Sequence, residues 1–572
     1  MTNQAQVTVM KFGSSVLRSE ADLPSVVHEI YRHWRRGVQV IVVVSAFGDT
    51  TDELMRRAEK VCVKPDRSAL AALLATGEAA SSALRGMALN RSGIPCRLLD
   101  PVQAGLRTVG NELDASPVAV DARRLLEESR SAVVVIPGFV GRGEYGDTTL
   151  LGRGGSDFSA LFLAHHLGAN CILVKDVPGL YTSDPACQAQ RALRFEQAGY
   201  ETALHVGGSV IQQKAIRFAL ANKLRFTITR IGAGTSTEIG PFVDRLESYA
   251  TSVEPIRVAL LGCGTVGGGV YERLTALPDL FAITGVGTRN RERAHDEGVP
   301  DSLLTSDLEA LVEGQCDVAV ELIGDTRRAA DLVKRALRGG KDVVSANKAL
   351  LAREGHELEA LADENEVGLR YSAAVGGVLP ALETIRRARG KGSLRGFSGV
   401  LNGTSNFVLD RMAAGETRSA AIRAAQELGF AESDPQKDLD GTDAAEKLIL
   451  LARVAFDANL SLDAVPRKGL NGLRSEALAT AREQGRTIRL IAECRRSPGG
   501  IDASVKPVEL PIDHPLAQVR DEKNRLVVEP EEGDAIVVSG KGAGRWPTTE
   551  AVMADLFDIR QTQPREALEA CA

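Results

Sequence analysis

The residues best suited to chemistry in this 572-residue chain lie in Glu432–Lys447, the segment ESDPQKDLDGTDAAEK. Asp443 and Lys447 are four residues apart, so they share one face of a predicted helix. Asp438 lies just before that helix, and Lys348 follows a predicted strand, where a lysine can protonate a carbonyl oxygen. A structural interpretation stays open, because Asp443 can be a first-turn carboxylate with Lys447 as its exposed ion-pair partner.

A glycine-rich turn predicts a binding site upstream of this segment. The apolar run Ile256–Leu261 predicts a strand, and Gly262, Gly264 and Gly267 follow it with the spacing G-x-G-x-x-G. The first glycine permits the turn, the second lets the backbone approach a pyrophosphate, and the third lets helix and strand pack closely. An amphipathic segment from Val270 predicts the helix whose N-terminus would bind the phosphates. A glycine-rich turn without a ligand is the alternative.

Arg289 indicates which dinucleotide such a turn would take. About 20 residues past the glycines an NAD site places an acidic residue against the ribose, and this chain has Arg289 there, after the predicted strand Phe281–Gly287. The arginine favours NADP, with NAD possible. The alternative is a surface arginine beside Arg291 and Arg293.

The elements that must position these residues alternate between strands and helices. Apolar runs such as Gln39–Val44, Ala132–Ile136 and Cys171–Val174 predict buried strands, with helical segments between them. This order predicts an α/β fold with mostly parallel sheets and helices on both faces. Ligands of such sheets bind at the carboxyl ends of the strands.

Polar residues collect at those strand ends in the N-terminal half. Lys11, Gly13 and Ser14 follow the first strand, and Thr148–Asp157 is a dense polar and glycine-rich loop. Such a loop can form a nest of backbone N–H groups for phosphate, with Lys11 compensating charge on a transferring group. Ordinary turns with a solvated lysine and serines are the alternative.

Composition limits the classes of protein to consider. The chain is 44% hydrophobic and 25% charged, with a net charge of −6 and a pI near 5.9, so we expect several soluble domains. It has no basic field for nucleic acid or an anionic membrane. Eight scattered cysteines without a C-x-x-C pair, no basic-apolar N-terminal leader and no long apolar run predict a cytoplasmic protein.

The N-terminal half resembles the catalytic domain of aspartate kinases, which have the amino-acid kinase fold. The resemblance covers residues 5–245 and rests on VMKFGSS, VVVSAFGDTTDEL, ATGEAASSAL, GDTTLLGRGGSDFSA and VKDVPGLYTSDP. It implies ATP, Mg²⁺ and phosphorylation of the aspartate side chain. The implied roles are charge neutralisation by Lys11, phosphate contacts from Gly13 and Ser14, aspartate binding by Ser45, Glu78 and Arg153, and nucleotide contacts from Asp176, Tyr181, Asp184 and Pro185.

This half departs from the aspartate kinase pattern at several positions. The family usually has KFGGTSV where this chain has KFGSSVL, and Asp49, Lys175 and Gln212 stand where Lys, Thr and His are common. These replacements leave room for an altered substrate or a weak kinase. The family also usually continues into ACT domains, whereas the segment before Ile256 is too short for one. We therefore expect no ACT-mediated feedback by threonine or lysine.

The C-terminal half resembles homoserine dehydrogenase. GCGTVGGGV, ELIGDT, ANKALLA, YSAAVGGVLP, LNGTSNF, ESDPQKDLDGTDAAEK, HPLA and GKGAGRWPT occur in that family's order over residues 256–560. The resemblance implies NAD(P)-dependent interconversion of aspartate 4-semialdehyde and homoserine. The implied cofactor contacts are Gly262, Gly264, Thr265, Val266, Gly267, Arg289, Asn347, Lys348 and Gly542.

The same resemblance implies roles at the substrate. Lys348 would be the acid/base lysine, and Glu432 would bind the substrate amino group. Asp438, Asp443 and Lys447 would hold the hydroxyl end and its water. Asn402, Gly403 and Thr404 would border the cofactor, and Gly403 would also contact the substrate.

Two positions in this half depart from the dehydrogenase pattern. Ser372 replaces a Glu beside the family's sodium site, so dependence on Na⁺ or K⁺ is doubtful and the metal is unknown. Asp325 and Arg328 replace a Gly and a Pro near the cofactor.

The sequence thus predicts a fused enzyme with an amino-acid kinase fold, a Rossmann domain and an α+β catalytic and dimerisation domain. We expect the kinase-like domain at 5–245, a linker at 246–255, the Rossmann domain at 256–385 and the last domain at 386–572, whose end returns to the cofactor domain. The partners would be small-molecule substrates, and the protein a homo-oligomer. The rivals are a dehydrogenase with a silent nucleotide-binding or interaction module, and an oxidoreductase for another amino alcohol.

Overall fold

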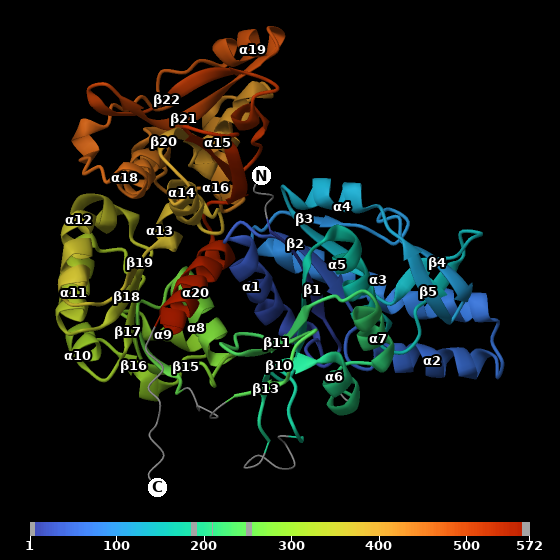
Figure 1. The fold of residues 1–572 in the computed structure, drawn as a ribbon. Helices are drawn as coiled ribbons and strands as arrows, with labels where there is room; N and C mark the ends of the chain where they lie inside the picture. Colours follow the sequence, from blue (N-terminus) through green and yellow to red (C-terminus); the bar gives the residue numbers. More distant parts are fainter. Residues whose placement is uncertain (1–5, 185–191, 209, 248–253, 563–572) are drawn as a thin grey trace. The chain divides into compact units, whose positions relative to one another are not determined.

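The computed structural model describes residues 6–184, 192–208, 210–247 and 254–562. These residues divide into two compact units, the first ending at Val253 and the second spanning Glu254–Gln563 (Figure 1). Among the helices described, none combines the length and the apolar character needed to cross a membrane.

The first unit is built on a nine-stranded, mostly parallel sheet. Its central strands are nearly continuous apolar runs, as expected for strands covered by helices on both faces. In spatial order the strands are β13 (Arg245–Leu246), β10 (Phe195–Gly199), β12 (Ser236–Gly240), β11 (Phe226–Arg230), β9 (Asn170–Lys175), β1 (Val7–Phe12), β2 (Gln39–Val44), β6 (Val133–Pro137) and β3 (Cys96–Leu98).

Helices cover this sheet, and the first unit also has a separate four-stranded sheet. Helices α1 and α3 pack on β2, whereas α4 and α5 pack together and on β1, β2 and β6. The helices are α1 (Leu23–Trp34), α2 (Thr50–Val61), α3 (Arg67–Arg91), α4 (Ala122–Ser129), α5 (Gly155–Leu167), α6 (Tyr200–Val206) and α7 (Gln213–Ala221). The second sheet has the order β5 (Asp114–Ala119), β4 (Arg107–Asn111), β7 (Val140–Arg142), β8 (Thr148–Leu150).

The second unit begins with a six-stranded parallel sheet. Its order is β16 (Leu304–Thr305), β15 (Phe281–Gly287), β14 (Ile256–Leu261), β17 (Val318–Glu321), β18 (Asp342–Ser345), β19 (Leu369–Arg370). The order reverses direction at β14, which is where parallel α/β sheets bind ligands. Its helices are α8 (Thr265–Thr275), α9 (Arg291–Asp296), α10 (Leu308–Glu313), α11 (Thr326–Arg338), α12 (Lys348–Glu364) and the late helix α20 (Arg545–Thr562), which packs on α8.

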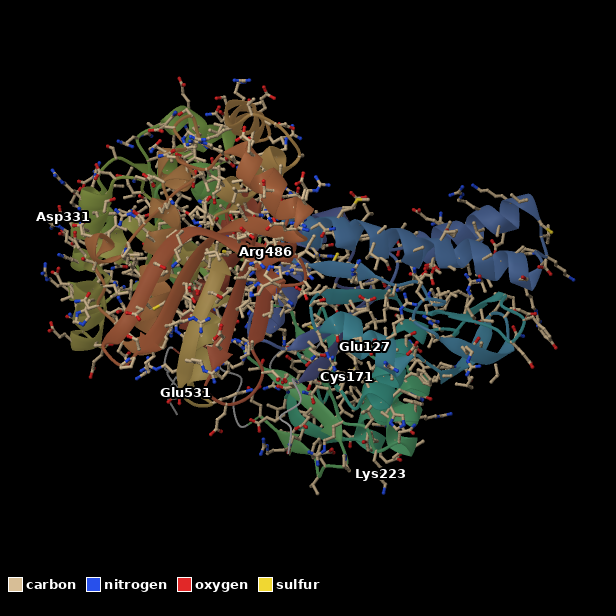
Figure 2. The ribbon with its side chains drawn as sticks, turned by 90° about the horizontal axis from the view of Figure 1, so that it is seen from above. Glu127, Cys171, Lys223, Asp331, Arg486 and Glu531 are labelled. Carbon is tan, nitrogen blue, oxygen red and sulfur yellow. The ribbon has the colours of Figure 1, made fainter. Side chains whose placement is uncertain are left out.

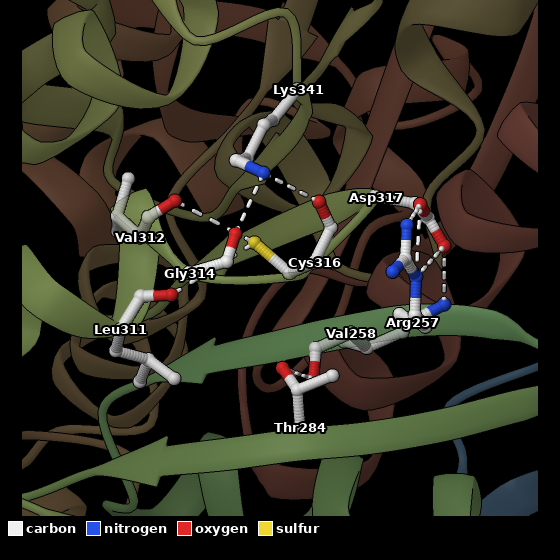
Figure 3. Close-up of polar contacts among 9 residues, drawn as sticks. All are labelled: Arg257, Val258, Thr284, Leu311, Val312, Gly314, Cys316, Asp317 and Lys341. Atoms are coloured by element: carbon white, nitrogen blue, oxygen red, sulfur yellow. Dashed lines mark hydrogen bonds and ion pairs between the residues drawn. The ribbon is translucent and has the colours of Figure 1, made fainter.

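Polar contacts fix the amino ends of these strands. Arg257 and Asp317, at the starts of β14 and β17, form an ion pair with a shortest distance of 2.6 Å (Figure 3). The Lys341 ammonium, just before β18, donates to the carbonyl oxygens of Gly314 and Cys316 at 2.9 and 2.8 Å. These contacts lie at the edge of the sheet opposite the carboxyl ends.

The helix after the glycine turn begins earlier than the periodicity predicted. Helix α8 starts at Thr265, not Val270, and takes in three consecutive glycines. A Cβ at Gly267 would meet the Gly262 carbonyl oxygen at 2.0 Å, and one at Gly269 would meet Thr549 Oγ1 of α20 at 2.4 Å. Close packing on both sides therefore outweighs the low helix propensity of glycine.

The remainder of the second unit packs helices on one face of a five-stranded antiparallel sheet (Figure 2). The sheet order is β22 (Gly500–Pro511), β21 (Arg486–Ser497), β20 (Leu394–Val400), β23 (Lys523–Pro530), β24 (Ile536–Lys541). The helices are α13 (Ser372–Gly376), α14 (Ala381–Arg389), α15 (Gly403–Ala413), α16 (Arg418–Glu427), α17 (Gln436–Leu439), α18 (Thr442–Phe456) and α19 (Ser475–Glu483). Helix α18 is almost entirely buried and packs against α12, α14 and β21.

Candidate functional site

A cluster of charged side chains joins the cofactor-binding sheet to α18. Lys348, the first residue of α12, places its Nζ 3.0 Å from Asp443 Oδ1. Lys447, one turn along α18, places its Nζ 2.9 Å from Asp443 Oδ2. Each carboxylate oxygen thus faces one ammonium group. The ion pair of Asp443 and Lys447 is present, but Lys447 is buried and not exposed as the structural interpretation predicted, and Lys348 joins the pair.

Asn402 holds the carboxylates of this cluster in place. Its side-chain amide donates to Asp438 Oδ1 at 2.6 Å and to Asp443 Oδ2 at 2.8 Å. Its side-chain oxygen accepts the Ser405 N–H and so caps the N-terminus of α15. Lys447 also donates to the Leu401 carbonyl oxygen at 2.8 Å. The loop that begins α15 therefore orients both acidic groups.

Burial and the neighbouring charges shift the pKa values of three members of this cluster. The Asp443 carboxylate raises the pKa of Lys348, against the opposing effect of burial. Burial acts to raise the pKa of Asp443, but Lys447 and Lys348 outweigh it and hold that pKa below its usual range. Burial, then Asp443, raises the pKa of Asp438. Lys348 is therefore a cation at neutral pH, ready to donate a proton.

Two predicted substrate-binding residues, Glu432 and Gly403, do not belong to the charged cluster around Asp443. The Glu432 side chain is exposed, and the contact that fixes its segment runs from Gln426 to its backbone carbonyl at 3.1 Å. A Cβ at Gly403 would meet the Glu522 carbonyl oxygen at 2.4 Å, which by itself requires glycine there. Glu446, which no motif singled out, is buried beside Lys348, and burial raises its pKa. Its place on the buried face of α18 was the available signal.

The glycine turn has the geometry of a phosphate cradle. Gly262 has a φ of 110°, in the left-handed region that favours glycine. A Cβ at Gly264 would meet nothing within 4 Å, so the space above it is open. No side chain caps α8 at Gly264, and its first-turn N–H groups at Thr265 and Val266 can meet an anion. The residues present fit a dinucleotide pyrophosphate.

Arginines lie near this turn. Arg289 is exposed, at the end of β15. Arg293, which the sequence suggested only as a surface residue, donates from Nη2 to Thr265 Oγ1 at 2.7 Å. A cationic group thus reaches the first residue of α8.

The loop after β24 packs against Asn524, which in turn contacts the backbone beside the charged cluster. A Cβ at Gly542 would meet Asn524 Nδ2 at 1.9 Å, and Asn524 donates to the Leu401 carbonyl oxygen at 3.0 Å. That oxygen also accepts from Lys447. Gly542 therefore allows the loop to lie against the residues that hold the cluster.

Of the departures from the dehydrogenase pattern, Asp325 has a structural role of its own, whereas Ser372 is held through its backbone N–H. Asp325 caps α11, accepting the N–H groups of Arg327 and Arg328 at 3.0 and 3.2 Å. The Ser372 N–H donates to Asp555 Oδ2 at 2.8 Å. Within the described ranges, no group of three or more His, Cys, Asp or Glu side chains is arranged to hold a metal ion.

The first unit has its own charged cluster at the carboxyl ends of β1 and β9. Lys11 Nζ lies 2.8 Å from Asp157 Oδ1, and Lys175 Nζ lies 2.8 Å from Asp157 Oδ2. All three side chains are buried. Asp157 lies in the first turn of α5, whose N-cap Gly154 has a φ of 74° and no capping side chain. Two ammonium groups and a free helix N-terminus suit a phosphate.

Burial governs the pKa values in this cluster. It lowers the pKa of Lys11 to about 8, and Lys175 lowers it further while Asp157 opposes the shift. The two lysines outweigh burial at Asp157 and hold its pKa below the usual range. A Cβ at Gly13 would lie 2.5 Å from Lys11 Nζ, so glycine keeps the space around the ammonium group open.

Of the predicted aspartate-binding residues, Ser45 and Glu78 make contacts inside the first unit, whereas Arg153 is exposed. Ser45 Oγ lies 2.8 Å from Ser156 Oγ, and Glu78 Oε1 accepts the Ala46 N–H at 3.3 Å. Burial raises the pKa of Glu78 to about 7, and its Oε2 has no hydrogen-bond partner among the described residues.

The predicted nucleotide residues lie along the chain at and after these strand ends. Ser14, Asp176 and Asp184 are exposed. Tyr181 is half-buried, and its backbone forms an isolated antiparallel β-bridge with Arg194. Pro185 lies outside the described residues.

The fold and these sites define an α/β enzyme that joins two nucleotide-binding units. The amino acid kinase family matches residues 6–235, the homoserine dehydrogenase NAD-binding domain matches 262–372, and the homoserine dehydrogenase family matches 380–557. This order matches that of a bifunctional aspartate kinase/homoserine dehydrogenase.

Individual relatives agree with these matches. The homoserine dehydrogenase of Corynebacterium glutamicum is 36% identical over 53% of this chain and 71% of its own length, and that of Bacillus subtilis is 35% identical over 54% and 73%. The crystal structure of a homoserine dehydrogenase from Thiobacillus denitrificans is similar with a TM-score of 0.52 and 34% identity, covering 54% of this chain and 73% of that one. The chain belongs to the homoserine dehydrogenase family and carries an amino acid kinase domain ahead of it.

Proposed function

We propose that the second unit reduces aspartate 4-semialdehyde to homoserine with NADPH and that Lys348 provides the proton. The contact between Lys348 and Asp443 carries this proposal, because it holds a cationic acid at the carboxyl edge of the cofactor-binding sheet. NADPH would supply the hydride to the carbonyl carbon. Lys348 would give its proton to the carbonyl oxygen, which becomes the hydroxyl of homoserine, and Asp443 would keep the ammonium group aimed at that oxygen.

The other predicted residues would bind the substrate and the cofactor. Asp438 and Lys447 would hold the hydroxyl end and a water, and Glu432 the amino group, with Gly403 beside them. The turn at Gly262–Gly267 would take the pyrophosphate, supported by the open space above Gly264. Asn347 and Gly542 would border the nicotinamide.

The test of this function is NADPH oxidation by the purified protein with aspartate 4-semialdehyde. Lys348→Ala and Lys348→Met should abolish turnover while NADPH still binds, measured by its fluorescence. Glu313→Gln, an exposed carboxylate of α10, is the matched control. In the reverse direction NADP reduction should occur with homoserine and not with serine or threonine. Reduction with serine or threonine instead would favour an oxidoreductase for another amino alcohol.

The preference for NADP over NAD is a further part of the proposal. Arg289 follows β15, and Arg293 reaches Thr265 at 2.7 Å, so two guanidinium groups border the region where a 2′-phosphate would lie. Arg289→Ala and Arg293→Ala should each raise the KM for NADPH and leave the KM for NADH unchanged. Equal effects on both cofactors would contradict the assignment.

We propose that the first unit phosphorylates the side chain of aspartate with ATP. Lys11 and Lys175 on Asp157 support this, because two ammonium groups can stabilise charge on a phosphoryl group in transfer. Gly13 and Ser14 would contact the phosphates, and Asp176, Tyr181 and Asp184 the nucleotide. Ser45, Glu78 and Arg153 would bind aspartate, and Mg²⁺ would enter on the ATP phosphates.

Formation of aspartyl hydroxamate with ATP, Mg²⁺ and hydroxylamine tests the kinase. Lys11→Ala and Arg153→Ala should remove this reaction and leave NADPH oxidation intact. ATP binding without hydroxamate would instead favour a silent nucleotide-binding module. We also propose a homo-oligomer, to be tested by light scattering coupled to gel filtration.

A further inference from the structure

Glu321 is a carboxyl group without solvent access in the cofactor-binding sheet. It is the last residue of β17, and the whole residue is 0% exposed. In the parallel register it lies beside Ser345 of β18 on one side and Leu261 of β14 on the other. Leu261 is the residue before the glycine turn. The carboxyl group therefore lies below the carboxyl edge of the sheet, between the strands that lead into the proposed site.

Both carboxyl oxygens of Glu321 accept hydrogen bonds, one from the loop after β17 and one from Ser345 at the end of β18. Oε1 accepts the Ile323 N–H at 2.7 Å, and Oε2 accepts the Ser345 hydroxyl at 2.6 Å. Ser345 Oγ in turn accepts the Asn347 N–H at 3.1 Å, and the Asn347 amide donates to the Ile323 carbonyl oxygen at 3.0 Å. These four hydrogen bonds connect the loop after β17 to the loop after β18.

Each of these loops touches a part of the dehydrogenase site. Lys348 directly follows Asn347, whose side-chain oxygen caps α12 by accepting the Leu350 N–H at 3.1 Å. On the other side, a Cβ at Gly262 would meet the Leu322 carbonyl oxygen at 2.8 Å, so the loop after β17 backs the glycine turn. The Glu321 carboxyl group thus connects the loop that leads into Lys348 with the loop that contacts the glycine turn.

We propose that Glu321 is a positioning residue for hydride transfer, whose carboxylate fixes the Lys348 loop relative to the glycine turn. The proposal rests on the proposed roles of Lys348 and Gly262. Glu321 touches neither substrate nor cofactor, and it acts through Ser345, Ile323 and Asn347. Glu321 can accept both hydrogen bonds only when its carboxyl group is ionised.

The ionised form of Glu321 fits the hydrogen bonds around it. Both oxygens accept, from the Ile323 N–H and the Ser345 hydroxyl. If Oε2 carried a proton, Ser345 would have to accept from Glu321 as well as from Asn347, and the Ser345 hydroxyl proton would lose its acceptor. Burial raises the pKa of Glu321 to about 7, opposed by the hydrogen bonds from Ser345, Ile323 and Asn347. The groups that face it from β14, β18 and the two loops are uncharged within the described part of the chain.

Glu321→Gln tests the proposal, because the amide keeps the shape and is neutral at every pH. With saturating substrates, kcat of the unchanged protein should fall as the pH drops below about 7, where Glu321 protonates. The kcat of E321Q should be about tenfold lower at alkaline pH, since small misplacements of reacting groups cost up to about 10²-fold. The ratio of the two kcat values should approach one toward pH 6, with little change in KM.

Ser345→Ala provides a second test that keeps the carboxyl group. Removing one donor should raise the pKa of Glu321, so the acid limb of kcat should move to higher pH. Glu313→Gln is the control, and thermal unfolding of each variant reports its fold. A purely structural role would lower the melting temperature and reduce kcat by the same factor at every pH.

The outcomes separate this inference from the proposed function. A pH-independent kcat ratio for E321Q, or an unmoved acid limb in S345A, would overturn the role of Glu321 while Lys348→Ala remains inactive. Full activity of Lys348→Ala would instead overturn the proposed function. If E321Q does not fold, the acid limb of S345A decides alone.

Discussion

At the scale of single residues, Asp443 organises the dehydrogenase site. Its carboxylate contacts Lys348, Lys447 and Asn402 at 3.0, 2.9 and 2.8 Å. Its burial would be costly without these partners, so the ion pairs and the amide account for a charged group in the interior. The same contacts make the lysine of α12 a stronger base and a persistent cation.

We predict that Asp443→Asn lowers kcat by at least about 10²-fold and destabilises the protein by about 3 kcal/mol, because it leaves the buried Lys447 and the half-buried Lys348 without their counterion. It also removes the largest cause of the raised pKa of Lys348. Reduction needs protonated Lys348, so its alkaline limb should move to lower pH in the variant. The pH profile of residual NADPH oxidation measures this, with Glu313→Gln as the control. An unmoved limb would contradict the role of Asp443.

A second prediction concerns Lys175, which stands where the aspartate kinase pattern usually has Thr. Lys11 has a pKa of about 8, and Lys175 is one of the groups that lower it. If the kinase reaction needs cationic Lys11, its rate should fall above about pH 8 in the unchanged protein. In Lys175→Met the pKa of Lys11 should rise, so the fall should begin at higher pH. Hydroxamate formation across this range provides the measurement, and a limb that stays at its original pH would count against the assignment.

At the scale of elements, the sequence predicted strands better than helix ends or site geometry. The predicted strands Phe281–Gly287 and Ile256–Leu261 match β15 and β14, since buried parallel strands read as apolar runs between turns. The predicted start of helix α8 was wrong, because the three glycines at its beginning were interpreted as part of a loop. The meeting of Lys348 with Asp443 depends on the packing of α12 on α18, which no local pattern encodes, so only the family resemblance could suggest it.

The glycines of α8 give a prediction at this scale. Gly269→Ala should destabilise the second unit by about 1–2 kcal/mol, because overpacking against α20 outweighs the gain of about 1 kcal/mol in helix propensity. The clash would be with Thr549 Oγ1, which is held by its hydrogen bond to the Arg545 carbonyl oxygen at 2.7 Å. Thr549→Ala in the same chain should recover part of the loss in urea unfolding. Gly392→Ala is the control, since its Cβ would meet nothing within 4 Å. Equal stability of Gly269→Ala and the control would refute the packing argument.

At the scale of the whole molecule, each charged cluster is complete within one unit. Lys11, Asp157 and Lys175 belong to the first unit, and Lys348, Asp443 and Lys447 to the second. The two proposed reactions are not consecutive either, because the acyl phosphate must first be reduced to the semialdehyde by another reductase. Fusion therefore does not by itself imply transfer of an intermediate between the units.

We predict that the two reactions can be lost separately and that the kinase reaction does not respond to threonine or lysine through an ACT domain placed between the kinase-like domain and β14. Residues 241–255, between strand β12 of the kinase-like domain and β14, contain only the two-residue strand β13 among the described positions. A regulatory domain of ordinary size, about 50 residues or more, cannot lie there. Lys11→Ala should lose hydroxamate formation and keep NADPH oxidation, and Lys348→Ala the reverse. Millimolar threonine or lysine should leave the rate of hydroxamate formation by the unchanged protein as it was. Strong inhibition of hydroxamate formation by either amino acid would require an effector site elsewhere in the chain, and loss of both reactions in Lys11→Ala would show that the units depend on each other.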